Sequence, residues 1–435
     1  MEPETAVTRK RLLIEDWLPI AEIGIESVRE RRSMTSLPPT YYLHVWWARR
    51  PLIASRAAVL ASVLPVGADR QQFLDALGIH GDPMAAKARI ADADRNGERL
   101  GANAYGYKRA FTHSPDTNDF PHVCVLDPTA GGGSIPFEAV RLGQNVIAND
   151  LNPVAWLVLM ATVDLPHRFG PKLLKRYGQL SKIFGERCKD RIRHLYPSER
   201  DGAVPDGYFW ARTVKCNYCG GTVPLSTNWI LTGKGEGVRL RPIQDSGSNI
   251  CRFEIVNTRE EQSDGTVTGG DAKCPFPGCN ETISGDEIKR QAQAGQMGQQ
   301  LYAIAYRFDK KVGETKSGKP KIKRQRAFRS PREEDDIDAL MTERLATKMP
   351  EWEAQGIVPD EDRYLGHSDR CGLFGVKKFT QMFSPRQLFS HCTSVEVFQE
   401  LVGELEADGP MPELDRAALT YVALAIDKLV DWNSL

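Results

Sequence analysis

The residues with the clearest chemical use lie between Val123 and Asp150, in the stretch VCVLDPTAGGGSIPFEAVRLGQNVIAND. A short apolar run ends at Asp127, and a turn with three consecutive glycines, Gly131–Gly133, follows it. Glycine lets the backbone approach a ligand closely because it has no Cβ atom. The helix that follows offers free N–H groups to an anion. Asp150 closes the next apolar run, where an acid suits hydrogen bonds from ribose hydroxyls.

The same stretch predicts its own local structure. The apolar run before Asp127 favours a buried strand, and Ser134 is expected to cap a helix that Gly143 ends. Residues 145–148 favour a second strand, which gives a strand–loop–helix–strand unit. The loop is neither GxGxxG nor a Walker loop. The alternative interpretation is a strand crossover that binds no nucleotide.

Four of the nine cysteines form two pairs with metal-ligand spacing. Cys216 and Cys219 are separated by two residues, and Cys274 and Cys279 by four. Four thiolates suit tetrahedral Zn²⁺, and a set with no open position is typical of a structural site. The distance of 54 residues between the pairs exceeds that of common ribbons, so a chance pairing is the alternative. Cys251 is a candidate substitute ligand without a nearby partner cysteine.

A basic segment lies at residues 310–329, which hold nine Lys or Arg against one Glu. Such a segment is either a loop or hairpin with solvated charges or a contact for a nucleic-acid backbone. The candidate contacts are Lys319, Lys321, Lys323, Arg324 and Arg326.

An aromatic and basic cluster lies near the N-terminus, in HVWWARRPL. One interpretation is a packed aromatic subcore with arginines at its rim. The other is a wall of the ligand pocket beside the glycine turn, with His44 and Trp46 as the candidate contacts.

The composition excludes several classes of protein. The 435 residues are 41% hydrophobic and 26% charged, as in globular chains, and suffice for two or three domains. No apolar run reaches transmembrane length and no signal-peptide pattern is present, so we expect a cytoplasmic protein that does not bind membranes. A net charge of zero means that nucleic acid would have to bind local patches.

The motif DPTAGGGSIPFEA resembles the first motif of amino-methylating DNA methyltransferases. Together with KRLLIEDWLPI, HVWWARRPL, NDLNPVA, the cysteine pairs and KKFTQMFSPRQL, it resembles the adenine-specific DNA methylases that contain a zinc ribbon. The resemblance implies S-adenosylmethionine as cofactor and methyl transfer to adenine N6 in DNA. The implied cofactor residues are Asp127, Pro128, Thr129, Ala130, Gly131, Gly132, Gly133, Asp150, Leu151 and Asn152, with His44 and Trp46 beside them.

The chain departs from this family at the catalytic motif, which is Asp, Asn or Ser followed by Pro-Pro and an aromatic residue. The one Pro-Pro pair, Pro38–Pro39, lies between Leu37 and Thr40. The resemblance places the motif beyond the last residues given, so no catalytic residue is assigned. We expect a portion of an enzyme that is truncated or that a second polypeptide completes.

The resemblance also implies a doubly wound, Rossmann-like methyltransferase sheet, here incomplete, with an inserted β-rich zinc ribbon. The expected regions are an N-terminal helical and aromatic segment (1–66), a polar helical linker (67–120), the cofactor-binding α/β domain (121–212), the zinc-ribbon insertion (213–308), a basic loop (309–331) and a helical C-terminal region (332–435).

Three functions are compatible with these features. The favoured one is the cofactor-binding portion of a DNA adenine methyltransferase. The second is a catalytically inactive, zinc-containing protein that binds DNA or acts as a scaffold. The third is a methyltransferase for RNA or protein that uses another catalytic group.

Overall fold

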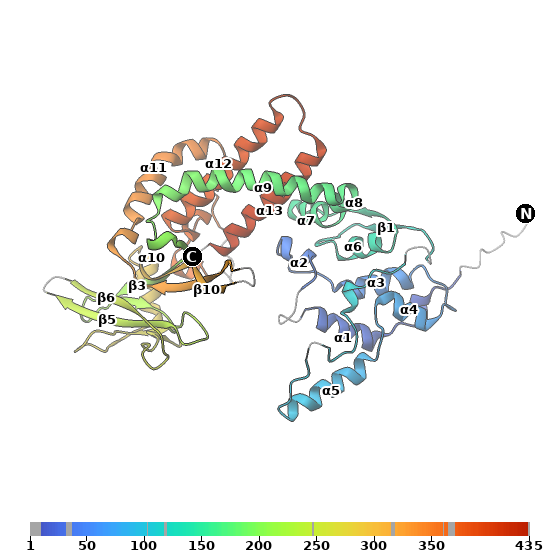
Figure 1. The fold of residues 1–435 in the computed structure, drawn as a ribbon, viewed down its shortest axis with the longest axis horizontal. Coiled ribbons are helices and arrows are strands. Elements are labelled where there is room, and N and C mark those ends of the chain that lie inside the picture. Colours follow the sequence, from blue (N-terminus) through green and yellow to red (C-terminus); the bar gives the residue numbers. More distant parts are fainter. Residues whose placement is uncertain are drawn as a thin grey trace, which may run out of the picture. The chain divides into compact units, whose positions relative to one another are not determined.

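The computed structural model describes residues 10–31, 37–101, 103–116, 120–245, 248–314, 318–359, 361–363 and 370–433 (Figure 1). The chain divides into two compact units: residues 1–185 with 398–432, and residues 186–397 with 433–435. Helices α9 (Pro171–Ile192) and α12 (Pro385–Glu406) each run from one unit into the other. The expected mixed α/β class is confirmed.

The glycine-rich stretch of the first unit forms strand β1 (Cys124–Asp127), helix α6 (Ser134–Arg141) and strand β2 (Asn145–Ala148). The two strands are parallel and pair from Cys124 with Asn145 to Asp127 with Ala148. Among the described residues this sheet has two strands. The predicted Ser134 cap is wrong: Gly133, with φ 77°, holds the N-cap position and Ser134 is the first helical residue.

Short helices precede this sheet and cover one of its faces. Val125 and Val146 pack against the same buried core as α3 and α4. At the start of α3, the backbone N–H groups of Leu52 and Ile53 donate to the buried Glu30 carboxylate, whose pKa burial raises. The helices are α1 (Ile20–Glu30), α2 (Thr40–Leu43), α3 (Leu52–Ala61), α4 (Arg70–Leu77) and α5 (Pro83–Arg95).

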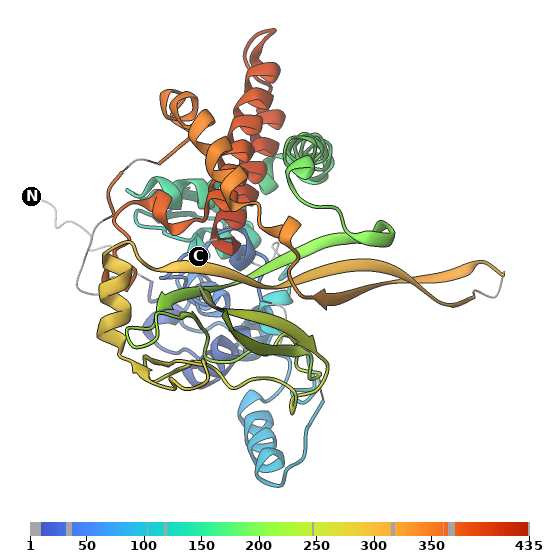
Figure 2. The ribbon, with the colours of Figure 1, turned by 90° about the vertical axis from the view of Figure 1, so that its left-hand side faces the viewer.

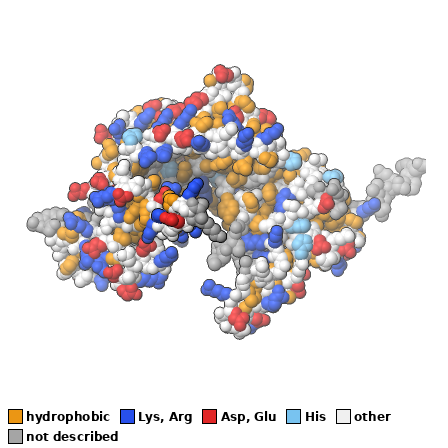
Figure 3. All heavy atoms as spheres, viewed as in Figure 1, with side chains coloured by type: hydrophobic (Ala, Val, Ile, Leu, Met, Phe, Trp, Pro, Cys, Tyr) orange, Lys and Arg blue, Asp and Glu red, His pale blue; other side chains and the backbone are white. Residues whose placement is uncertain are grey.

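Helices that follow β2 complete the first unit. They are α7 (Pro153–Leu159), α8 (Leu165–Phe169) and α13 (Glu413–Trp432), with a π-helical turn over Met160–Asp164. The Tyr421 hydroxyl of α13 donates to the Ala161 carbonyl, 2.6 Å away, which ties the last helix to this turn. Lys and Arg side chains are visible along α9 in Figure 3.

The second unit is built on a four-stranded antiparallel sheet of order β11–β10–β3–β4. Residues 309–331, predicted as a basic loop, instead belong largely to β10 and β11, with 315–317 outside the described residues. The two strands pair from Ile304 with Arg329 to Lys311 with Ile322, and their distal part runs beyond β3 (Figure 2). The strands are β3 (Val204–Lys215), β4 (Thr222–Leu225), β10 (Gly298–Glu314) and β11 (Pro320–Arg329).

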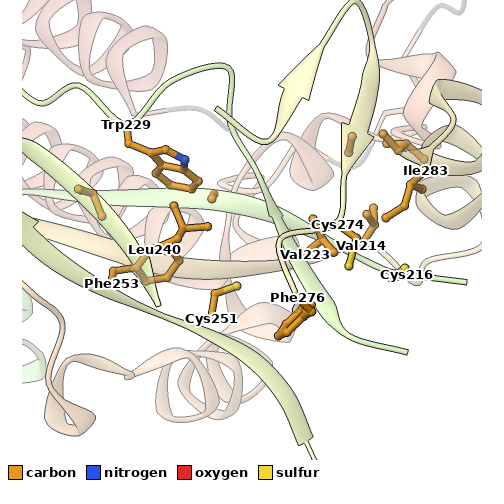
Figure 4. Packing of buried hydrophobic residues seen from close by; sticks show 14 of the residues in the cluster. Val214, Cys216, Val223, Trp229, Leu240, Cys251, Phe253, Cys274, Phe276 and Ile283 are labelled. Carbon is orange, nitrogen blue, oxygen red and sulfur yellow. The ribbon is translucent and has the colours of Figure 1, made fainter. Parts of the chain in front are cut away.

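Two smaller antiparallel sheets pack on this one. They are β5 (Gly237–Asp245) with β6 (Ser248–Val256), and β7 (Val267–Thr268) with β8 (Asp271–Lys273) and β9 (Thr282–Ile283). Their shared core includes Trp229, Phe253 and Phe276 (Figure 4).

Helices α10 (Gly285–Gln293), α11 (Asp338–Ala354) and α12 complete the second unit. Buried residues of α11 and α12, including Met341, Trp352 and Phe389, form a separate helical core. Within the described ranges no helix is both long and apolar enough to cross a bilayer.

Candidate functional sites

The glycine loop turns sharply between β1 and α6. Gly131 and Gly133 have φ values of 53° and 77°, a left-handed conformation that favours glycine. The Asp127 carboxylate accepts the Thr129 N–H at 3.2 Å and so closes the first part of the turn. The Ala130 N–H donates to the Asn149 carbonyl, which joins the loop to the end of β2. The loop therefore lies at the carboxyl end of two parallel strands, where open α/β sheets bind ligands.

Asp150 fixes this loop from the other strand. One carboxylate oxygen accepts the Asn152 N–H at 2.9 Å and the other accepts the Gly131 N–H at 2.8 Å. These two bonds lower the pKa of Asp150, so the group is an anion at neutral pH. A carboxylate has about four lone-pair sites, which leaves acceptor capacity for ligand hydroxyls. Asn152 caps α7 by accepting the Val154 N–H, and the neighbouring Leu151 side chain is 98% exposed.

Trp46 packs directly on the glycine loop. A Cβ atom at Gly131 would lie 2.7 Å from Trp46 Nε1, and one at Gly132 would lie 2.9 Å from Trp46 Cδ1. The Cγ atom of buried Arg49 would be 3.0 Å from the same Gly132 position. A Cβ atom at Gly133 would lie 2.9 Å from Leu159 Cδ2, so all three positions require glycine for packing within the protein, whether or not a ligand binds.

His44, two residues before Trp46 in the chain, contacts helix α13. Its Nε2 is 3.6 Å from the Asp427 carboxylate on α13, and its Nδ1 is 2.8 Å from the Val45 carbonyl. The structure therefore brings Trp46 to the loop, whereas it joins His44 to α13. Pro128, Thr129 and Ala130 lie in the loop as expected from their positions in the chain.

A buried ion pair holds the N-terminal helices to α6. Arg56 and Glu138 both have side chains that are 0% exposed, and Arg56 Nε donates to Glu138 at 2.7 Å. Arg56 also donates to the carbonyls of Leu77 and Ala110, and Arg141 donates to the other Glu138 oxygen. No role was predicted for Arg56, and Arg49 was expected at the rim of an aromatic subcore or beside the ligand pocket; their polarity alone gives no signal of burial.

The four cysteines predicted as zinc ligands meet in the second unit. The Sγ atoms of Cys216, Cys219, Cys274 and Cys279 all lie within 4.8 Å of one another. Two of the Sγ–Sγ distances are 3.7 Å and 3.6 Å, for Cys216–Cys279 and Cys219–Cys274. Zn–S bonds of about 2.3 Å in a tetrahedron place sulfurs about 3.8 Å apart. The cluster therefore fits a metal such as zinc.

The two turns that carry these cysteines are built alike. In each turn the residue after the second cysteine is left-handed, with a φ of 69° at Gly220 and of 53° at Asn280. Gly221 packs under the buried Phe276 ring, where a Cβ would lie 2.4 Å from a ring carbon. Cys251 is fully buried among the core residues of Figure 4, and burial raises the pKa of its thiol to about 12, so it is a neutral core residue.

The predicted nucleic-acid contacts all lie on β11 or next to it, but they differ in whether an acid of the chain pairs with them. Lys321, Lys323 and Arg324 are exposed. Arg326 forms an ion pair with Asp206 at 2.9 Å, which Arg307 of β10 also contacts at 2.8 Å. Lys319 lies at the distal end, just before β11 begins.

Comparison with known proteins gives one partial similarity. Residues 17–76 match the family described as "Protein of unknown function (DUF1156)". The matched segment includes Trp46, Arg49 and Arg56, the side chains that pack on the glycine loop and on α6. No curated protein and no solved structure matches the chain.

Proposed function

We propose that this chain is the S-adenosylmethionine-binding portion of a DNA adenine-N6 methyltransferase, with the two strands β1 and β2 belonging to a larger doubly wound sheet. The observation that carries the proposal is the link between Asp150 and the Gly131 N–H. It joins a left-handed glycine loop to an ionised acid at the carboxyl end of two parallel strands.

The residues of the loop have complementary roles in this proposal. Asp127 and the backbone of Gly131–Gly133 bind the methionine end of the cofactor, and the free acceptor sites of Asp150 bind the ribose hydroxyls. Exposed Leu151 offers an apolar surface for the adenine ring. Bound cofactor supplies an electrophilic methyl group, whereas no residue of this chain is assigned to the target adenine.

The second unit would then contact the DNA. The cysteine cluster holds Zn²⁺ as a structural ion, because all four ligands are thiolates and no position is left open. The lysine-rich strands β10 and β11 bind the DNA backbone, and a second polypeptide carrying the catalytic motif completes the site. The cytoplasm is the proposed location.

Calorimetric titration of S-adenosylmethionine into the purified chain tests the cofactor site. We expect binding that Asp150→Ala weakens about tenfold to a hundredfold, because a charged acceptor of hydroxyl hydrogen bonds is lost. Asp150→Asn keeps the size of the side chain and removes its charge, so its affinity for S-adenosylmethionine should lie between that of the parent chain and that of Asp150→Ala. Asp94→Ala, a change at an exposed residue of α5, is the matched control and should bind like the parent.

Equal binding by all four proteins would contradict the assigned role of Asp150. If the parent chain binds no S-adenosylmethionine but still binds DNA, the second candidate function is favoured instead. That candidate is a catalytically inactive, zinc-containing DNA-binding protein, and the four-cysteine cluster, in the same unit as the exposed lysines of β11, is the observation that supports it.

A further inference from the structure

Strands β10 and β11 pair to form a two-stranded antiparallel ribbon, the β10–β11 ribbon. Its charges are distributed unequally between its two faces. Side chains alternate along a strand and cross-strand partners share a face. One face therefore carries Arg307, Asp309 and Lys311 with Arg324 and Arg326. Asp206 pairs with both Arg307 and Arg326, and Lys311 bonds to Glu314, so acids compensate much of this face.

On the other face, Glu199 and Asp335 compensate Arg329 near the sheet, but the lysines further along the ribbon have no such compensation among the described residues. Lys310 lies directly across from Lys323, and Lys321 lies two residues further along β11. All three side chains are exposed and have no ion-pair or hydrogen-bond partner in the part of the chain that the structure describes. Like charges placed opposite each other destabilise a strand pair, so this arrangement is suited to a bound polyanion.

Aromatic rings continue the same face toward the sheet. Tyr306 and Phe308 precede Lys310 at two-residue spacing, and their ring centroids are 5.9 Å apart. Tyr306 is the cross-strand partner of Pro205, and Ile304 is the partner of Tyr208. The basic–aromatic face thus runs from Lys321, Lys323 and Lys310 through Phe308 and Tyr306 to Tyr208.

A pocket of about 500 Å³ lies at the inner end of this face. Pro205, Tyr208 and Tyr196 line it, and the two tyrosine rings are 5.7 Å apart. The Tyr208 hydroxyl is buried and has no hydrogen-bond partner among the described residues. Lys189 and Arg193 also line the pocket, and both are exposed cations without a described partner.

We propose that the basic–aromatic face binds single-stranded DNA and that one base enters the pocket that Tyr196 and Tyr208 line. Cations spaced along a surface follow the phosphates, while successive aromatic rings stack on bases; this combination is typical of single-strand binding. A duplex hides its bases from such rings. The inference specifies the proposed DNA contact and rests on it, but it uses only residues of the second unit.

Fluorescence anisotropy with a labelled oligonucleotide of mixed sequence and its annealed duplex tests this inference. We expect the intact chain to prefer the single strand. Lys310→Gln combined with Lys323→Gln should weaken binding at least tenfold and reduce the slope of log K against log salt by about 1.4, since each lost phosphate contact accounts for about 0.7. The matched control is Lys234→Gln combined with Arg259→Gln, which removes two exposed charges outside β10 and β11 and should cost less than threefold.

The aromatic part of the inference has its own variant. Phe308→Leu keeps the half-buried site apolar, removes the stacking ring and should weaken single-strand binding about tenfold, with the salt slope unchanged. Equal losses from both double variants, tighter binding of duplex, or tighter binding of the matching RNA strand would each overturn the proposal. Titration with S-adenosylmethionine separates the two ideas: a chain that binds the cofactor but no single strand refutes this inference alone, and the reverse refutes the cofactor site alone.

Discussion

The guanidinium of Arg56 shows how a single buried charge can join distant parts of the chain. Arg56 is 82 residues from Glu138 in the sequence, and its side chain is fully buried. It also donates hydrogen bonds to the carbonyls of Leu77 and Ala110. A buried ion pair adds little net stability over a well-packed apolar pair, but the loss of one partner leaves the other charge unsatisfied. Arg56 therefore positions α6, and with it the glycine loop, against the N-terminal helices.

We predict that Arg56→Met lowers the free energy of unfolding of the first unit by about 3 kcal/mol. The value lies at the lower end for a broken buried pair because Arg141 still contacts Glu138. Urea denaturation followed by tryptophan fluorescence measures the change. Arg99→Met, at an exposed position, should have little effect, and an equal loss in both variants would contradict the role given to Arg56.

Trp46 was a candidate beside the glycine turn, where it lies, but nothing in the sequence indicated that Arg49 and Arg56 are buried. Arg56 acts through Glu138, which is 82 residues away in the chain, and neither residue type nor spacing reveals such a partner. Asp127, Gly131, Gly133 and Asp150 were predictable because the loop forms within one strand–helix–strand unit. The bond from the Gly131 N–H to Asp150 was not predicted, and it means that the acid shapes the loop before any ligand arrives.

At the scale of elements, the cysteine turns could be read from the sequence because each forms within six residues. For the β10–β11 ribbon the sequence left a loop and a hairpin open, because the distal parts of its strands are rich in Lys and Arg rather than in β-branched and aromatic residues. Pairing of β10 with β3 over residues 298–307, and with β11 from residue 304 onward, gives this segment an order that its own composition does not predict.

The metal cluster leads to a prediction at this same scale. We expect about one zinc per purified chain, and we expect Cys274→Ser to remove most of it, because three thiolates hold the ion less tightly than four. The sheets around the cluster should then unfold at lower temperature, since binding free energy of a structural ion contributes to folding. Elemental analysis and thermal scanning measure both effects.

The control for this prediction is Cys124→Ser, an exposed thiol of β1 that lies outside the cluster. Retention of zinc by Cys274→Ser, or equal loss in the control, would show that these four thiolates are not the binding site.

At the scale of the whole molecule, the β1–β2 sheet leaves one apolar face open. Leu126 and Ile147 are cross-strand partners with exposed fractions of 65% and 59%, whereas Val125 and Val146 on the other face pack against the core. Parallel sheets are normally covered on both faces. This open face is therefore expected to drive association.

We predict that the chain in isolation self-associates with rising concentration through this face. Leu126→Thr combined with Ile147→Thr should reduce the average mass measured by light scattering after size exclusion. Leu174→Thr, at another exposed leucine on α9, is the matched control. A monodisperse monomer for the parent chain at high concentration would contradict the prediction.

The first unit is formed by two separate stretches of the chain, residues 1–185 and 398–432, and this affects how it folds during synthesis on the ribosome. The carbonyl of Ala161 is synthesised 260 residues before its partner, the hydroxyl of Tyr421, and residues 186–397 of the second unit are translated between them. Since domains generally fold as they emerge, the second unit can form its sheets while the first still lacks α13. A nascent chain stopped before residue 398 would thus carry the glycine loop without the last helix of its unit, and we expect chaperones to bind this intermediate.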